Sequence, residues 1–370
     1  MTAAPALQVP HAGYHGSWVW NRFFEGWYYR LTIPDLAESF AFMYSIERDP
    51  WAKGGGMSGG SAQLLGPQDH HQWRTFPRIE GFWADPEQLA LGHWGKTQGL
   101  GSVLPPQYLD PTDFWRYVRE GYQATATLNQ GILRDPASRQ VTRWCYQIRP
   151  IHTYGIPPQA TMGWLSYLPI FEPGWQILMA EGGAEGWLEW QGSTYRFGGE
   201  LAPAAAYVEK NWGGSFPSQW FWMQCHQADS ALSLTSAGGK RGVLGIPQTV
   251  GMVSLHWRGR FFAWLPENSQ IAWRVDPWGA WQVVAQQSDY KIMLRGTASR
   301  PGTPLLAPTS RGLRLVCRET LHGHLHLQLW QRVGQVWTPI LETHSEWAGL
   351  ETGGDPWSTP WQVGDPQLLS

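Results

Sequence analysis

The chain of 370 residues has a formal net charge of −2, and it contains no cluster of lysine and arginine and no acidic run. This charge pattern argues against nucleic acid or an anionic membrane as an electrostatic partner. No run of about 18 apolar residues is present, which excludes a transmembrane helix, and the first residues lack the basic and apolar segments of a secretory signal. We therefore expect a soluble or peripherally attached protein, with two domains favoured over one large domain.

Aromatic residues make up 14% of the chain, almost as much as the 15% that is charged, and 26 residues are tryptophan. Tryptophan is costly to bury because its indole N–H needs a partner. The surplus has two interpretations: the rings line a cavity or groove, or they fill barrel interiors and sheet faces. The three cysteines, which lack any Cys-x-x-Cys spacing, predict neither a disulfide framework nor a zinc knuckle and fit a reducing compartment; they are Cys145, Cys225 and Cys317.

In chain order, the secondary structure is predicted to be mostly β. Large apolar side chains alternate with smaller ones over residues 40–46, and leucines alternate with His324, His326 and Gln328 over residues 324–329. A period of two is typical of half-buried strands. Asp-Pro and Gly-Gly pairs separate such segments, and residues 111–122 are the best helix candidate. The chain is therefore predicted to be all-β, with antiparallel barrel or sandwich architecture.

A weak internal echo favours two similar halves. Phe-Glu-Gly-Trp-Tyr-Tyr at 24–29 resembles Phe-Pro-Ser-Gln-Trp-Phe-Trp at 216–222, since each is an aromatic residue, a short polar bend and an aromatic strand. The composition changes over residues 195–205, where Gly198-Gly199 is followed by an alanine-rich stretch. We therefore predict domains 1–200 and 201–370, with the active site at or near their junction.

Two motifs suggest ligands only superficially. The glycine-rich stretch 54–60 lacks the Lys-Ser/Thr ending of a phosphate loop and predicts a flexible or bulged connection. The alternating histidines His322, His324 and His326 would share one face of a strand, as some metal sites require. No fourth ligand is identifiable, so we expect a solvated or cavity-lining face and predict no metal site.

The stretch 207–226 combines a carboxylate, a lysine, a Gly-Gly turn and a run of large aromatic residues. These residue types suit acid chemistry inside an apolar pocket rich in rings, although a loop that enters a core strand would have the same composition. In an extended segment Glu209 and Lys210 point to opposite faces, which leaves Glu209 free to face a pocket. Cys225 and His226 are separated in the same way, which argues against a local thiolate dyad.

Motifs along the chain resemble those of the tocopherol cyclase family. In family order, from about residue 10 to residue 362, they are His11-Ala-Gly-Tyr14-His, Arg22-Phe-Phe-Glu25-Gly-Trp27-Tyr-Tyr, Phe42-Met-Tyr44-Ser-Ile-Glu47, Gly163-Trp-Leu-Ser-Tyr-Leu-Pro169-Ile-Phe-Glu172-Pro, Tyr207-x-Glu-Lys-Asn-Trp-Gly213 and Glu351-x-Gly-Gly-Asp-Pro-Trp357. The resemblance implies two lipocalin-like antiparallel β domains with little helix. It extends more distantly to carotenoid hydratases, in which a Tyr-x-Asp precedes the Trp-Gly; Tyr207 and Glu209 match these positions, and Glu moves the carboxyl group by one methylene.

The resemblance also implies a reaction, the closure of a chromanol ring from a prenylated hydroquinone in vitamin E biosynthesis. The alkene is protonated and the phenol oxygen captures the cation, so no cofactor is expected. We expect Glu209 to be the general acid, with Tyr207 or Asn211 orienting it and Lys210 adjacent, and with Glu25 and then Glu172 as further candidates. The residues expected to bind the substrate are Trp27, Trp212, Phe216, Trp220, Trp222 and Gln224. Aromatic faces suit a developing cation.

Other classes remain open: a non-catalytic carrier of isoprenoid lipids, an enzyme resembling the carotenoid hydratases, or a carbohydrate-binding protein. The expected partner is a small lipophilic prenylquinol, with no obligate protein partner and no nucleic acid. Because such a substrate is insoluble, we expect peripheral contact with a membrane, the cytoplasmic side of a thylakoid in a photosynthetic organism, with no signal or transit peptide. No amphipathic basic helix indicates that contact.

Overall fold

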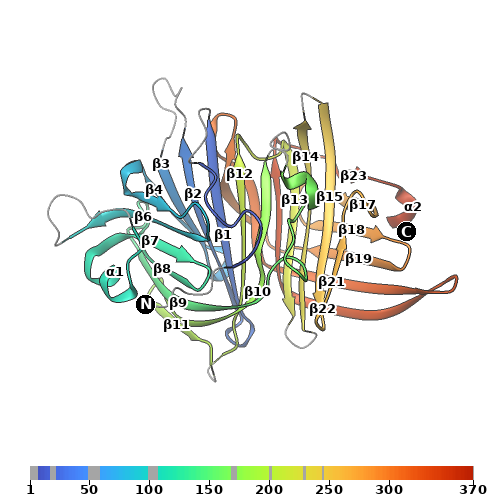
Figure 1. Cartoon of the computed structure of the whole chain (residues 1–370), viewed down its shortest axis with the longest axis horizontal. Helices are drawn as coiled ribbons and strands as arrows, with labels where there is room; N and C mark the ends of the chain where they lie inside the picture. Colours follow the sequence, from blue (N-terminus) through green and yellow to red (C-terminus); the bar gives the residue numbers. More distant parts are fainter. Residues whose placement is uncertain are drawn as a thin grey trace. The chain divides into compact units, whose positions relative to one another are not determined.

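The computed structural model describes residues 7–16, 22–48, 59–98, 107–167, 173–199, 202–227, 231–243 and 246–369. Within these ranges the strands form two antiparallel sheets, one of 12 strands and one of 11 (Figure 1). The predicted all-β, lipocalin-like class is confirmed. No helix among the described residues is long and apolar enough to cross a membrane.

The strands of the first sheet follow the order β4-β3-β2-β1-β12-β10-β9-β8-β7-β6-β5, with β11 paired to β10. Their bounds are β1 Phe23–Ile33, β2 Glu38–Arg48, β3 Gly59–Leu65, β4 His71–Phe76, β5 Phe82–Ala84, β6 Ala90–Thr97, β7 Val118–Thr125, β8 Leu128–Arg134, β9 Val141–His152, β10 Gly174–Trp190, β11 Ser193–Phe197 and β12 Ala205–Gly213. Short 3₁₀ turns lie at Pro34–Leu36, Pro67–Asp69 and Ile79–Gly81.

The second sheet has the order β16-β15-β14-β13-β22-β21-β19-β18-β17-β23, with β20 paired to β21. Its strands are β13 Gln219–Gln227, β14 Leu232–Val243, β15 Ile246–Trp257, β16 Arg260–Trp264, β17 Gln270–Val275, β18 Ala280–Gln286, β19 Tyr290–Thr297, β20 Thr303–Thr309, β21 Gly312–Val333, β22 Val336–Gly354 and β23 Trp361–Val363. A 3₁₀ turn lies at Gly163–Tyr167 and a short helix, α2, at Pro366–Leu369.

Both sheets begin with the same meander. β1 to β4 pair in sequence, as do β13 to β16, and the first strand of each set also pairs with a much later strand, β12 or β22. The echo between 24–29 and 216–222 thus falls at or just before corresponding strands. The chain divides into two compact units, the first made of 1–161, 173–215 and 308–313 and the second of 162–172, 216–307 and 314–370. The predicted boundary at 200/201 precedes β12, whose hydrogen bonds to β1 and β10 assign it to the first unit.

Aromatic side chains fill the core of each unit. The alternation over residues 40–46 is confirmed, because Phe40, Phe42, Tyr44 and Ile46 are buried in the first core. In the first unit β4 is at one end of the first sheet and β6 is next to the other end. The ring centroids of Phe76 in β4 and His93 in β6 are 4.9 Å apart, so the two ends of the sheet curl toward each other. The tryptophans among the largest fully buried side chains are Trp144, Trp190, Trp264, Trp273 and Trp281. For these five rings the interpretation as core filling is correct.

The predicted helix is shorter than expected. Helix α1 spans Pro111–Tyr117 and starts with Asp110, whose side chain accepts a hydrogen bond from the Asp113 N–H. It ends where β7 begins, because residues from Val118 onward pair with β6 instead of continuing the helix. Sheet pairing therefore overrides helix propensity over residues 118–122.

Candidate active site

Strand β12 lies inside the first sheet, paired with β1 on one side and β10 on the other. Val208 and Ala206 point into the first core, and Lys210 is paired in register with Trp27, another core residue. Lys210 therefore faces the core side. Glu209 faces the opposite side of the sheet, as the alternation of a strand predicts.

On the core side, Lys210 forms a buried ion pair with Glu25. Its Nζ lies 2.6 Å from the Glu25 carboxylate, and both side chains are fully buried. The same ammonium group donates to the Gly13 carbonyl and lies 3.1 Å from His15 Nδ1. The His15 backbone N–H donates to the other Glu25 oxygen at 2.8 Å. The pair thus fixes the segment around residues 13–15 against β1 and β12.

The ion pair keeps Glu25 charged. Burial opposes that charge, but the Lys210 ammonium and the hydrogen bond from His15 outweigh it and hold the pKa of Glu25 below its usual value. Burial lowers the pKa of Lys210, an effect that the Glu25 carboxylate opposes. A carboxylate paired in this way does not hold a proton at neutral pH, so Glu25 lacks the property that a resting general acid needs.

Two further rings lie on the Lys210 side. The Trp212 ring stacks on His15 with centroids 4.1 Å apart, and the Lys210 ammonium lies 5.2 Å from its centroid. Trp27 is buried in the core and packs against Tyr14 at 6.2 Å. Both predicted substrate-binding rings therefore lie on the side of β12 opposite Glu209.

On the other face, Glu209 is buried and accepts two hydrogen bonds on one oxygen. Tyr207 O–H donates to Oε2 at 2.6 Å, and the Trp175 indole N–H donates to the same atom at 3.0 Å. Tyr207 thus holds the Glu209 carboxyl group in place, while Asn211 lies two residues further along the same face, half-buried. Trp175 was not predicted. The pairing of β10 with β12 sets Trp175 beside Asn211, and no local sequence pattern indicates this pairing.

The remaining predicted substrate-binding residues belong to the second unit. In β13, Phe221, Met223 and Cys225 point into the second core. Trp220, Trp222, Gln224 and His226 alternate with these core residues and are also buried, so they lie on the opposite face of the sheet. The Gln224 amide lies 3.4 Å from the His226 ring nitrogen, and Phe216 packs edge-on against Trp220 at 5.4 Å.

The same face of the second sheet carries a buried carboxyl pair that the sequence did not indicate. Glu351 is paired in register with Trp222 on one side and with Glu319 on the other. Burial raises the pKa of Glu351, against the opposing effect of hydrogen bonds from Trp220 and Cys317. Two carboxylates directly opposite each other in a dry site resist being charged together. The pKa of Glu351 is therefore shifted in the direction that acid chemistry requires. Glu351 is the first residue of the last family motif in the sequence. Its position opposite Glu319 depends on the register of β21 and β22, which the sequence alone does not give.

Two expectations fall outside the described residues. Glu172, the third candidate acid, lies there, and so do residues 54–58 of the glycine-rich stretch. Of the three alternating histidines, His326 belongs to a group of potential metal ligands, and its partners come from the neighbouring strand.

The two antiparallel sheets define an all-β protein of the lipocalin-like class. The tocopherol cyclase-like family model matches residues 21–354. The chain is 36% identical over 385 aligned positions to the probable chloroplastic tocopherol cyclase of Oryza sativa subsp. japonica, which covers 96% of this chain and 81% of that protein. The chain is also 36% identical to the chloroplastic tocopherol cyclase of Zea mays, in an alignment that covers 96% of this chain and 80% of that protein. The chain belongs to the tocopherol cyclase family.

A solved structure supports the fold alone. The structure of CghA with Sch210972 aligns with a TM-score of 0.52 at 10% sequence identity, covering 90% of this chain and 89% of that one. At this identity the likeness extends to the arrangement of the strands and not to the chemistry of the site.

The buried ion pair gives a test of the site's architecture. Lys210→Met should lower the free energy of unfolding by about 3–5 kcal/mol, because it leaves Glu25 buried and charged without a partner. The double variant Glu25→Leu/Lys210→Met should cost less than Lys210→Met alone. Urea unfolding followed by circular dichroism measures all three proteins.

The exposed pair Arg143–Glu189, at 3.1 Å, is the matched control, and Arg143→Met should cost less than about 1 kcal/mol. The pH dependence has a defined sign. Because the pKa of Glu25 is lower in the folded state than its usual value of 4.5, its stabilising contribution is complete above that value and is lost as the pH falls through the folded-state pKa. A Lys210→Met cost no larger than the control would show that the pair is not an anchor.

Proposed function

We propose that this protein is a tocopherol cyclase, which closes the chromanol ring of a prenylated hydroquinone. The observation that carries the proposal is the 36% identity to curated tocopherol cyclases over 96% of the chain. The site geometry is consistent with it, because the first unit holds a buried carboxyl group with two directed donors on one face of its sheet.

The reaction is an isomerisation in which no atom is gained or lost. A carboxylic acid gives its proton to the less substituted carbon of the nearest alkene, and a tertiary cation develops on the other carbon. The phenol oxygen then bonds to that carbon, and its proton returns to the carboxylate. No electron leaves the substrate, so we propose a cofactor-free cyclase of the intramolecular lyase type.

We propose Glu209 as the general acid. The two donors on Oε2, Tyr207 and Trp175, stabilise the carboxylate that remains after the proton has left. Preorganised donors of this kind lower the barrier because they need no rearrangement as charge develops. Lys210, the adjacent residue, serves a different purpose: on the opposite face it anchors the segment around residues 13–15 and does not neutralise Glu209.

The developing cation needs a π-face and little water. Cation–π attraction contributes about 2 kcal/mol or more at a desolvated ring. The Trp212 ring lies on the face of β12 away from Glu209, and the Lys210 ammonium group already lies 5.2 Å from its centroid. We therefore propose Trp175, whose indole N–H bonds Glu209, as the ring nearest the cation in the first unit.

Glu351 is the alternative acid within the second unit. It is buried, its pKa is raised by burial, and it is bonded by the Trp220 indole. Trp220 and Trp222, both proposed as substrate-binding residues, lie on the same face.

Incubation with a prenylated benzoquinol in D₂O tests the proposed reaction. The purified protein should give a chromanol with one deuterium on the ring carbon formed from the less substituted alkene carbon, because the acid exchanges with solvent before it protonates the substrate. Mass spectrometry and NMR locate the label. If the protein binds the substrate but returns it unchanged, it is a carrier of isoprenoid lipids instead. If the product is a tertiary alcohol, the protein is a hydratase.

The two candidate acids are separated by a pair of isosteric variants. Glu209→Gln should lower kcat by about 10²–10⁴-fold, the usual contribution of a general acid, while Glu351→Gln should leave most of the activity. Single-turnover cyclisation of the benzoquinol measures the chemical step. Glu189→Gln, an exposed carboxylate in the same unit as Glu209, is the control. The reverse pattern would transfer the role of the acid to Glu351.

We also propose peripheral contact with a membrane, from which a lipophilic substrate is taken. In the short turn Gly163–Tyr167, Trp164 is 65% exposed and Tyr167 is 61% exposed. Exposed aromatic side chains of this kind are typical of membrane–water interfaces. The curated relatives carry the designation chloroplastic, which is consistent with a photosynthetic membrane as the site of action.

Liposome flotation tests the contact. The wild-type protein should float with vesicles of plastid-like galactolipids, and Trp164→Ala/Tyr167→Ala should lose most of the floated fraction because the anchoring rings are gone. Tyr108→Ala, which removes a ring that is 51% exposed elsewhere, should float like the wild type. Wild-type protein that stays in solution, or equal flotation of the double variant, would contradict this role.

A further inference from the structure

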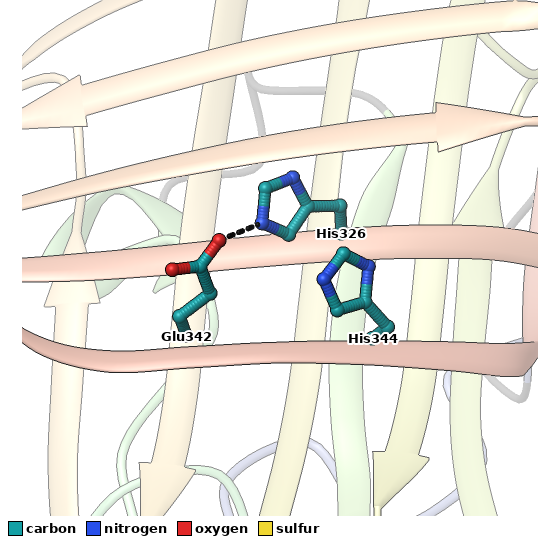
Figure 2. Close-up of side chains that lie close together, drawn as sticks. All are labelled: His326, Glu342 and His344. Carbon is teal, nitrogen blue, oxygen red and sulfur yellow. Dashed lines mark hydrogen bonds and ion pairs between the residues drawn. The ribbon is translucent and has the colours of Figure 1, made fainter.

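The outer face of the hairpin formed by β21 and β22 carries three side chains with metal-binding groups. His326 of β21 is paired in register with His344 of β22, and Glu342 lies two residues before His344 on the same face. Figure 2 shows the two imidazole rings and the carboxylate on one side of the hairpin. Their potential ligand atoms all lie within 4.8 Å of one another.

The three groups are already in contact. His326 Nε2 lies 2.8 Å from Glu342 Oε1, and the rings of His326 and His344 are stacked with centroids 4.2 Å apart and planes inclined by 4°. Rings stacked in this way hold their nitrogen lone pairs in nearly parallel planes, so one ring must rotate before both residues can bind the same ion. Two imidazoles and one carboxylate are a ligand set that Zn²⁺ takes in proteins, with a water at the open position.

The spacing of the ligand atoms, all within 4.8 Å of one another, fits such an ion once the side chains rotate. In a tetrahedral site with zinc–ligand bonds of about 2.0–2.2 Å, ligand atoms lie about 3.3 Å apart. His326 Nε2 and Glu342 Oε1 would therefore separate by about half an ångström as a metal ion replaces the proton between them. Glu342 and His344 are exposed, so both can rotate without disturbing a packed core.

The surroundings hold the site in place. On the opposite face of β21, Leu325, Leu327 and Leu329 are buried in the second core, which fixes the backbone beneath the ligands. The Gln328 amide donates to the Glu342 carboxylate at 3.1 Å, a hydrogen bond that orients the oxygen ligand. Ligands on rigid strands with such outer partners are the arrangement that metal sites require.

We propose that His326, Glu342 and His344 form a binding site for Zn²⁺ or a similar borderline divalent transition metal. The ion links β21 to β22 at the surface of the second unit. The site lies outside the proposed acid chemistry, and it does not depend on the proposed function.

The alternating histidines His322, His324 and His326, for which the sequence predicted no metal site, are a different set. His322 packs edge-on against the Trp347 ring at 5.6 Å, and the pairing of β21 with β22 is irregular between Thr320 and Leu325. His324 is exposed on the same face as His326 but does not belong to the convergent group. It is therefore a matched control.

Zinc titration of the full-length, chelator-stripped protein without a polyhistidine tag tests the proposal, with a chromophoric zinc indicator as competitor. The wild type should bind one Zn²⁺ per chain in a saturable manner. His344→Ala and Glu342→Gln should each weaken binding by about 10–100-fold or more, since even outer partners of metal ligands contribute that much. His324→Ala should bind like the wild type.

Co²⁺ provides a second readout, which reports the coordination geometry of the bound ion instead of its affinity. The wild type should give the visible absorption of a four-coordinate cobalt site, and His344→Ala should lose it while its circular dichroism stays that of the folded protein. Acidification should release the metal because protonated imidazole is not a ligand. Absence of saturable zinc binding in the wild type, or unchanged binding in His344→Ala, would overturn the proposal.

Discussion

The alternation of side chains along β12 is the constraint on which the first unit depends. Because β12 is paired on both sides, it cannot twist to bring Glu209 and Lys210 onto one face. Lys210 neutralises Glu25 within the first core, where it also binds the Gly13 carbonyl. Glu209 is thereby left in a separate environment whose described donors are neutral. Two adjacent ionisable residues thus lie in two separate environments instead of forming an ion pair with each other.

Buried carboxyl groups occur in two distinct electrostatic settings in this protein. Glu25 has a cation as partner and stays charged, whereas Glu209 and Glu351 each accept a hydrogen bond from an indole N–H, through Trp175 and Trp220. An indole satisfies a carboxyl oxygen without adding a positive charge, and its ring tolerates a nearby cation. Part of the tryptophan surplus is therefore explained by polar partners of carboxyl groups, and another part by core filling.

The features that could be predicted from the sequence are those set by local periodicity. The alternating runs at residues 40–46 and 324–329 became strands with the expected buried sides, because a period of two requires no distant partner. Family motifs led to Glu209 and Tyr207, which the structure brings into hydrogen-bond contact. Trp175 and Glu319 were missed, since their proximity to Glu209 and Glu351 arises from strand register and bulges that no local pattern encodes.

The pairing of β1 with β12 also bears on the order in which the chain can fold during synthesis. β1 ends at Ile33, but its second neighbour begins only at Ala205, so a nascent chain that stops short of β12 exposes an unpaired edge on both β1 and β10. Such edges are templates for pairing with other chains. The second unit repeats the arrangement with β13 and β22. In each unit, emergence of one late strand from the ribosome joins the two parts of the sheet and covers these two exposed edges, which shortens the interval in which they can pair with other chains.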